Sequence, residues 1–391
     1  MNIAIFTDTY PPFINGVSTS CYNLCQVLRA HGHNVLVVTP RSSDGPFEVI
    51  DNIAYVPGHE MKWLYGYRLT AIISPRLTKL VKDFKPDVIH NQTDSTIGQA
   101  SKIIARQLKV PIVYTYHTAY EDYTYYVTHG FFDRVARHTI RSYSQIVANS
   151  STEIITPSLK TKEYMRYSGS DLFINVIPTG IDFSIFADDK VDHERTRKFK
   201  EEHGITEDTK VFLILGRVAK EKSMDVSIRG FAHYHKTHPD VPVKMLVVGN
   251  GPQRPELEEL VKTLGINDIV EFIGAVPASE VPFYYHLADI YTSASITETQ
   301  GLTFMEAMSS GAIVLARYDT NLSGTIIDND TGFFFTSEDE FVEKAHYILN
   351  LNPEEKQKIL QNAYQIVDIY SIERFYVKIM EVYERAIKKY W

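Results

Sequence analysis

The feature that most constrains the fold is a series of short apolar runs separated by segments with helical periodicity. The first half contains "NIAIFTD", "NVLVVTP", "DVIHNQ", "PIVYTYHT" and "EIITPS", and the second half contains "KVFLILG", "VKMLVVG", "VEFIG", "DIYTS", "AIVLAR" and "GFFF". Helical patterns lie between them, for example over 17–30 and 255–264. Strands that are apolar on both sides are typical of parallel sheets covered by helices on both faces. The sequence therefore predicts an α/β protein built from two doubly wound, Rossmann-like domains.

The chain of 391 residues is longer than one ordinary domain, and its alternating pattern breaks once near the middle. Pro178 and Gly180 interrupt the pattern within "VIPTGID", residues 176–182. We expect a first domain over 1–180 and a second over 181–370. The last segment, "SIERFYVKIMEVYERAIKKYW", is amphipathic, and it predicts a helix over 371–391 that crosses back to the first domain.

Charge and composition narrow the possible partners and compartments. The net charge is −8, but residues 1–185 carry 17 Lys and Arg against 15 Asp and Glu. An acidic chain argues against nucleic acid as a partner, while the basic first half is compatible with an anionic surface. A strand pattern beginning at residue 2 and the lack of a long apolar run favour a cytoplasmic protein or one on a cytoplasmic membrane face. Cys21 and Cys25 are interpreted as small buried residues rather than a redox or metal pair.

Ligands of open α/β sheets bind beyond the carboxyl ends of the strands, so the residues there are candidates for a site. Gly16 follows the first strand where a helix begins, and the amide groups of a helix start attract anions. Arg217 and Lys222 follow "KVFLILG" and suit a diphosphate, although two solvated loop charges are an open alternative. Gly249 and Gly251 follow "VKMLVVG" in a tight turn that leaves space for a flat ring.

The stretch "TETQGLTFMEAMSSG", residues 297–311, places two carboxylates, Glu298 and Glu306, around a predicted helix start at Gly301. The amides of Gly301, Leu302 and Thr303 would then lack helical partners and could bind phosphate or sugar oxygens. The alternative is a capping box, with Thr303 as the N-cap and Glu306 three residues later. That alternative gives a helix of fewer than two turns and leaves Glu298 without a role.

Together and in this order, these motifs resemble the retaining GT-B glycosyltransferases of the glycogen-synthase-like, sugar-nucleotide-dependent group. The matching residues are Glu298 and Glu306, Arg217 with Glu221 and Lys222, Gly16, and the "PTGID" segment. The resemblance implies two Rossmann-like domains facing across a cleft. It also implies no tightly bound cofactor and no metal held by a pair of carboxylates, so "DND" at 328–330 is interpreted as a turn.

The resemblance also implies a role for each matching residue. Arg217 and Lys222 would hold the diphosphate of the donor, and Gly16 would add a backbone amide. Glu306 would bind the ribose, and Glu298 the donor sugar, with the amides of 301–303. His117 would contact the sugar near the reacting centre, although a histidine satisfied at a strand end is the plainer alternative.

Two positions depart from the family pattern. Ser223 replaces the glycine that usually follows the lysine, and Asn15 replaces the first glycine of a common pair. Both residue types are small or tolerate turns, so the resemblance holds.

The acceptor is suggested by "YHTAYEDYTYYVTHGFF", residues 116–132, which resembles a segment of bacterial diacylglycerol α-glucosyltransferases. Within it, Tyr120, Glu121, Asp122 and Tyr123 are candidates for contact with the acceptor, and solvated loop charges are the alternative for Glu121 and Asp122. Basic residues follow this segment at Arg134, Arg137, His138 and Arg141.

A second stretch, "EMKWLYGYRLTAIISPRLTKLVKDFK", adds Trp63, Tyr65 and Tyr67 to a predicted helix. Its apolar face carries Leu77, Leu80, Val81 and Phe84, and its outer side carries Arg76, Lys79, Lys82 and Lys85. Aromatic residues with a basic face suit an interfacial position on an anionic membrane, and an ordinary helix packed on the sheet is the alternative.

The resemblance implies transfer of an α-glucosyl unit from UDP-glucose to a membrane lipid, with 1,2-diacylglycerol as the expected acceptor. The enzyme would be peripheral (monotopic) on the cytoplasmic face of the cell membrane. The alternatives are transfer to a soluble sugar, polysaccharide or cell-wall polymer, a sugar-nucleotide epimerase, and a non-catalytic module that binds sugar nucleotides.

Overall fold

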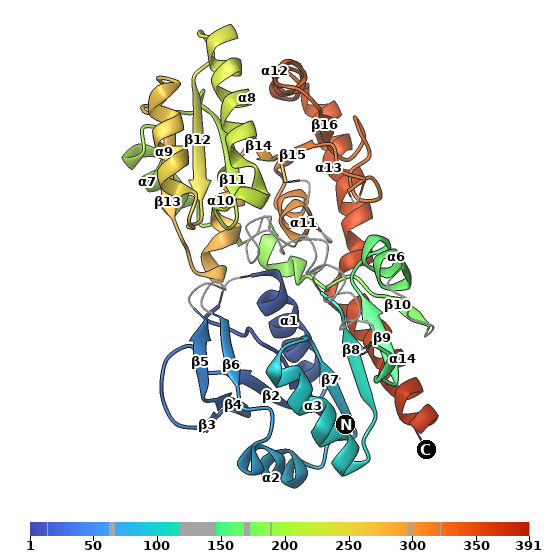
Figure 1. Ribbon diagram of the computed structural model, residues 1–391. Coiled ribbons are helices and arrows are strands. Elements are labelled where there is room, and N and C mark those ends of the chain that lie inside the picture. The colour runs from blue at the N-terminus through green and yellow to red at the C-terminus, as the bar shows by residue number, and fades with distance from the viewer. Residues whose placement is uncertain are drawn as a thin grey trace. The chain divides into compact units, whose positions relative to one another are not determined.

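The chain is divided into two compact units, one of Met1–Gly180 with Ile372–Trp391 and one of Ile181–Ser371 (Figure 1). The computed structural model describes residues 1–13, 15–61, 67–117, 146, 148–167, 173–187, 190–295, 298, 301–320 and 322–390. Each unit is a sheet of mainly parallel strands with helices on both faces. This arrangement confirms the predicted α/β class.

The first unit has an eight-stranded sheet in the order β10-β9-β8-β7-β1-β2-β4-β3, parallel except for the β3–β4 pair. Its strands are β1 (Asn2–Phe6), β2 (Asn34–Pro40), β3 (Glu48–Ile50), β4 (Ile53–Val56), β7 (Val88–Asn91), β8 (Ile112–Thr115), β9 (Glu153–Thr156) and β10 (Ile174–Val176). A separate hairpin pairs β5 (Gly58–Met61) with β6 (Tyr67–Thr70). Its helices include α1 (Gly16–Ala30), α2 (Pro75–Phe84), α3 (Thr96–Leu108), α6 (Leu159–Tyr167) and α14 (Ile372–Tyr390).

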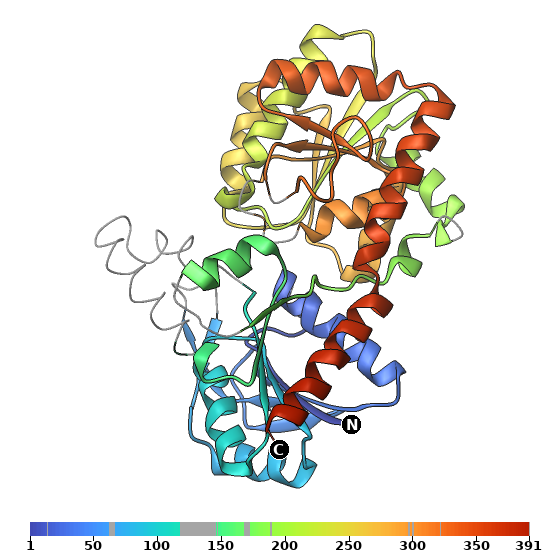
Figure 2. The ribbon, with the colours of Figure 1, turned by 90° about the vertical axis from the view of Figure 1, so that its right-hand side faces the viewer.

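Successive residues of the central strands face opposite sides of this sheet and enter two different cores. On one side Ile3 and Ile5 pack with α1 and the C-terminal helix α14. On the other side Ala4 and Phe6 pack with α2 and α3. Figure 2 shows α1 and α14 beside each other in the lower part of the view. Cys21 and Cys25 are free thiols, fully buried in the α1–α14 core, as predicted.

The second unit has a six-stranded parallel sheet in the order β13-β12-β11-β14-β15-β16. Its strands are β11 (Lys210–Leu215), β12 (Val243–Val248), β13 (Val270–Gly274), β14 (Ile290–Ser293), β15 (Ile313–Arg317) and β16 (Phe333–Phe335). Its helices are α7 (His193–Glu202), α8 (Met224–Thr237), α9 (Arg254–Thr263), α10 (Val281–Leu287), α11 (Leu302–Ser309), α12 (Glu338–Leu349) and α13 (Pro353–Val367). One core lies under α8, α9 and α12, and the other lies under α10, α11 and α13.

The predicted helix around residues 61–85 is wrong in its first part. Tyr67 lies on strand β6 of the β5–β6 hairpin, and Trp63 and Tyr65 lie outside the described residues. Helix α2 begins only at Pro75, because the Ser74 hydroxyl accepts a hydrogen bond from the Leu77 amide at 3.3 Å. The rest of the prediction is confirmed, since α2 buries its apolar face and leaves its basic residues exposed.

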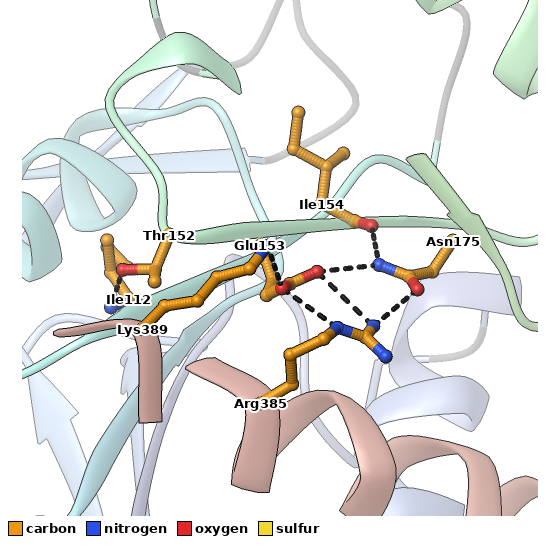
Figure 3. Close-up of polar contacts among 7 residues, drawn as sticks. All are labelled: Ile112, Thr152, Glu153, Ile154, Asn175, Arg385 and Lys389. Carbon is orange, nitrogen blue, oxygen red and sulfur yellow. Dashed lines mark hydrogen bonds and ion pairs between the residues drawn. The ribbon is translucent and has the colours of Figure 1, made fainter. Parts of the chain in front are cut away.

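The C-terminal helix is tied to the sheet of the first unit by a buried carboxylate (Figure 3). Glu153 of β9 accepts from Arg385 Nε at 3.0 Å and from Lys389 Nζ at 2.7 Å, and its side chain is 1% exposed. Asn175 of β10 donates to the same carboxylate at 3.0 Å. Burial raises the pKa of Glu153, but the bonds from Arg385, Lys389 and Asn175 outweigh it and hold the pKa below its usual value. In the described residues, no helix is long and apolar enough to cross a bilayer.

Candidate active site

The loop after β11 brings the two predicted cations to the carboxyl ends of the strands in the second unit. Lys222 Nζ contacts Glu298 Oε1 at 2.6 Å, although the two residues are 76 positions apart. The Arg217 guanidinium pairs with Glu221, whose side chain is 8% exposed. Both predicted cations of the diphosphate site therefore have a carboxylate partner.

Ser223 ends this loop and shows why the family prefers glycine at the position. Its φ of 47° and ψ of 40° are left-handed, and it precedes the first residue of α8. A left-handed backbone costs an ordinary residue on the order of 1 kcal/mol, whereas glycine adopts it freely. The departure from the family pattern is thus accommodated with local strain.

Helix α11 begins at Leu302, directly after Gly301, as one of the two alternatives predicted. Gly301 has a φ of 74°, and a Cβ there would lie 2.7 Å from the Leu322 side chain. The capping-box alternative is wrong, because the Thr303 hydroxyl instead accepts a hydrogen bond from Tyr291 at 2.8 Å. The amides of the first turn therefore point out of the N-terminus without a side-chain cap from Thr303.

Glu306 lies on α11 and is held by a tyrosine that the sequence did not suggest. The Tyr285 hydroxyl lies 3.0 Å from Glu306 Oε2 and 3.1 Å from the Thr303 carbonyl oxygen. Burial raises the pKa of Glu306 to about 7, and the bond from Tyr285 limits the rise. A carboxyl group with this pKa is about half protonated at neutral pH, so it must ionise before both of its oxygens can accept from ligand hydroxyls.

A small pocket joins these elements at the ends of β11 and β14. Lys222, Glu298 and Thr303 line it together, so the loop after β11 and the stretch 297–311 contribute to one pocket. The rest of its lining comes from β11, α8, β14 and the residue after β14, at Ile214, Leu215, Met224, Ser227, Tyr291, Ser293 and Ala294.

Gly249 and Gly251 serve a packing purpose in this site. A Cβ on Gly249 would lie 1.8 Å from the carbonyl oxygen of Gly216, and one on Gly251 would lie 2.2 Å from that of Val218. The glycines thus let the loop after β12 touch the loop that carries Arg217. The sequence predicted space for a flat ring beside these glycines. At their two Cβ positions, that space is instead occupied by the backbone of Gly216 and Val218.

The predicted residues of the first unit lie at the ends of its own strands. Gly16 is the first residue of α1, and the Asn15 side chain caps that helix by accepting from the Ser18 amide at 2.8 Å. Among the described residues, no heavy atom lies within 4 Å of a Cβ built on Gly16, so its backbone is open to a ligand. His117 Nε2 lies 2.5 Å from Gln92 Oε1.

The predicted acceptor residues Tyr120, Glu121, Asp122 and Tyr123 lie outside the described residues. The segment 328–330 forms a turn, as interpreted, in which Asp328 accepts from the Phe334 amide at 2.9 Å and Asn329 has a φ of 62°. In the part of the chain that the structure describes, no group of three His, Cys, Asp or Glu residues could hold a metal ion.

Comparison with known proteins identifies the family. Residues 195–366 match the family model "Glycosyl transferases group 1", and residues 14–184 match "Glycosyltransferase Family 4". The chain is 32% identical over 369 residues to the alpha-monoglucosyldiacylglycerol synthase of Acholeplasma laidlawii, covering 93% of this chain and 92% of the relative. The synthase of the same name from Streptococcus pneumoniae is 32% identical over 395 residues, covering 99% and 86%.

Solved structures agree on the fold. Anabaena HepE in complex with UDP-glucose superimposes with a TM-score of 0.74 at 18% identity, covering 97% of this chain and 98% of that one. WaaG, a glycosyltransferase of lipopolysaccharide biosynthesis, superimposes with a TM-score of 0.71 at 18% identity, covering 97% and 99%. The chain therefore belongs to the GT-B glycosyltransferases, in the group that includes the bacterial alpha-monoglucosyldiacylglycerol synthases.

Proposed function

We propose that this glycosyltransferase moves an α-glucosyl unit from UDP-glucose to 1,2-diacylglycerol with retention of the anomeric configuration. The observation that carries the proposal is the near-full-length similarity to two synthases whose names state this lipid product. The UDP-glucose complex of HepE, a protein of the same fold, supports the choice of donor.

The pocket of the second unit supplies the chemistry that the donor needs. Breaking the bond between the sugar and the phosphate places negative charge on the diphosphate, and cations aimed at that charge lower the barrier. On donor binding, Lys222 would leave its contact with Glu298 and bind the diphosphate. Arg217 would likewise leave Glu221 and bind the diphosphate. Glu298, once released, would accept from the sugar hydroxyls, and Glu306 would accept from the ribose. The first amides of α11 would add further donors.

The anomeric configuration is retained if the acceptor attacks the anomeric carbon from the same side from which the leaving group departs. The bond from the anomeric carbon to the phosphate oxygen breaks, and a bond to the lipid hydroxyl oxygen forms on the same face. The hydroxyl proton passes to an oxygen of the departing diphosphate, so charge and atoms balance. Gly16 and His117 are proposed to contact the diphosphate and the sugar respectively.

The lipid acceptor requires a surface that rests on a membrane. Helix α2 and its C-cap residue expose four basic side chains, at Arg76, Lys79, Lys82 and Lys85. The segment before the helix exposes Ile72 and Ile73, the latter 76% exposed. Basic and apolar side chains next to each other suit the boundary of an anionic bilayer. We propose a peripheral position on the cytoplasmic face of the cell membrane.

The test is incubation of the pure protein with radiolabelled UDP-glucose and vesicles that contain diacylglycerol and anionic phospholipid. We expect labelled monoglucosyl lipid. Label that moves only to a soluble saccharide would reject the lipid acceptor. Conversion of the donor to another UDP-sugar without an acceptor would support an epimerase instead, and nucleotide binding without turnover would support a binding module.

Lys222→Ala measures the contribution of the pocket. Loss of one cation at the diphosphate is expected to lower kcat roughly 100-fold, corresponding to about 3 kcal/mol of barrier. Lys220→Ala is the matched control, because Lys220 lies on the same turn and is exposed. Equal activity of both variants would contradict the role of Lys222.

A further inference from the structure

The predicted sugar-contacting residue His117 is joined to the C-terminal helix by a chain of buried polar groups. Gln92 follows β7, accepts at Oε1 from His117, and is 4% exposed. His90 lies two residues earlier on the same face of that strand and is fully buried. Its Nδ1 lies 2.6 Å from the Tyr383 hydroxyl of α14, and its Nε2 lies 2.7 Å from the Thr115 hydroxyl of β8.

The direction of the hydrogen bond between Tyr383 and His90 follows from the single hydrogen of the tyrosine hydroxyl. A buried tyrosine hydroxyl must place its proton on an acceptor. Among the described residues, the partner of the Tyr383 hydroxyl is His90 Nδ1, so Tyr383 donates and Nδ1 carries no proton. Burial, and to a smaller extent His117, lowers the pKa of His90 to about 3, so the ring is neutral. Its proton therefore lies on Nε2 and is donated to Thr115.

The orientation of the Gln92 amide follows from the position of that ring. Gln92 Nε2 lies 3.2 Å from His90 Nδ1 and 3.1 Å from His90 Nε2. An atom equally close to both ring nitrogens must lie over the face of the ring, because in the ring plane it would collide with Cε1. The face of an aromatic ring attracts an N–H group and repels a carbonyl oxygen. The amide nitrogen of Gln92 therefore faces His90, and its oxygen faces His117.

We propose that Tyr383, His90 and Gln92 are positioning residues that hold His117 in the tautomer with its proton on Nε2. A carbonyl oxygen only accepts, so His117 Nε2 donates to Gln92, and Nδ1 is left to accept from a hydroxyl of the bound sugar. Burial lowers the pKa of His117 to about 4, so the ring stays neutral at the pH of the cytoplasm. The role of His117 at the sugar rests on the proposed function, whereas its tautomer does not.

The tautomer is tested first, on the full-length protein labelled with 15N-histidine. The His117→Gln variant identifies the two ring-nitrogen signals of His117 by their disappearance. We expect a protonated Nε2 and an unprotonated Nδ1 at pH 7.5, without any substrate present. A His117 with its proton on Nδ1 would overturn the proposal. This readout is independent of the donor and acceptor, so the proposed function can fail without affecting it.

The chain of bonds is tested by two matched tyrosine variants on α14. Tyr383→Phe removes the donor to His90, and Tyr376→Phe removes a hydroxyl that lies 2.9 Å from His33 Nε2, outside this chain of bonds. Without that bond the His90 ring is no longer fixed, so its face no longer orients the Gln92 amide. We therefore expect Tyr383→Phe to give a mixture of His117 tautomers and to lower kcat roughly five- to tenfold, the size of one net hydrogen bond, at an unchanged KM for UDP-glucose. Tyr376→Phe should change neither the His117 tautomer nor kcat.

Two further results decide between a positioning role and a structural one. If Tyr383→Phe lowers the melting temperature but leaves the His117 tautomer as in the wild type, the proposal is overturned. Gln92→Glu keeps an acceptor at the position and should keep the proton on His117 Nε2, whereas Gln92→Met should lose the preference. The same tautomer in both Gln92 variants would also contradict the proposal.

Discussion

Donor binding is expected to release a proton from Glu306 when the solution is below neutral pH. The pKa of about 7 means that about nine in ten molecules are protonated at Glu306 at pH 6, and about one in ten at pH 8. The Tyr285 hydroxyl has one hydrogen but contacts two oxygens, Glu306 Oε2 and the Thr303 carbonyl, so a proton on Glu306 completes both contacts. A ribose diol donates two hydrogens and needs the ionised carboxylate instead.

The expected magnitude follows from these fractions. Binding of UDP-glucose should release about 0.9 proton at pH 6 and about 0.1 proton at pH 8, and the Kd should rise toward tenfold for each pH unit below 7. Isothermal titration calorimetry in buffers of different ionisation enthalpy measures the released proton directly. UDP-glucose is preferred to UDP, because UDP has a terminal phosphate that titrates in this range. Proton release that is zero at pH 6 would refute this role of Glu306.

Glu306→Gln provides the control and a second measurement. The variant cannot release the proton, so its heat of binding should be independent of the buffer. The folded pKa of Glu306 lies above the unfolded value of 4.5, so its protonated form stabilises the fold at low pH and this stability is lost as pH rises through 7. The neutral variant should therefore be more stable than the wild type at pH 8, on the order of 3 kcal/mol, and equal to it at pH 4. Equal stability at pH 8 would contradict the raised pKa.

Three further predictions concern the scaffold around the site. Ser223→Gly should stabilise the protein by about 0.5–1 kcal/mol in urea unfolding, because glycine relieves the left-handed φ; a loss of stability would contradict the strain. Gly249→Ala should destabilise by more than about 3 kcal/mol, because its Cβ would lie 1.8 Å from a backbone oxygen, and a folded variant with the wild-type melting temperature would refute that contact. Glu153→Gln should cost about 2 kcal/mol at pH 7. Because the folded pKa of Glu153 is depressed, this difference should shrink as pH falls below the unfolded value of 4.5, and a constant difference would count against the buried ion pairs.

The apolar runs predicted the central strands well, because a parallel strand buried on both faces leaves a continuous signal in the sequence. The short peripheral strands gave no such signal. Strand β5 of the hairpin reads "GHEM", which has no continuous apolar run, and the edge strand β3 is exposed at all three positions. The prediction of a helix at Tyr67 was wrong because aromatic residues before Pro75 extended an apolar periodicity that belongs only to α2. Local pattern cannot distinguish a hairpin followed by a helix from one longer helix.

The sequence predicts the members of the candidate site but not the contacts between them. Arg217, Lys222, Glu298 and Glu306 stay predictions, chosen because they belong to recognisable motifs after strand ends. The pairing of Lys222 with Glu298 was not predictable, since these residues are 76 positions apart and come together only when the sheet forms. The Tyr285–Glu306 contact spans 21 positions and the His90–Tyr383 contact spans 293. A tyrosine whose hydroxyl orients a distant residue is not part of any motif with a fixed spacing, so the sequence alone does not identify it.

The proposed donor site is tested most directly by a crystal structure of the protein with UDP-glucose bound. We expect a diphosphate oxygen within hydrogen-bond distance of Lys222 Nζ, at the N-terminus of α11, with Glu298 separated from Lys222 and turned toward the sugar. A structure in which Lys222 still contacts Glu298 at 2.6 Å while the nucleotide is bound at another place would contradict the account.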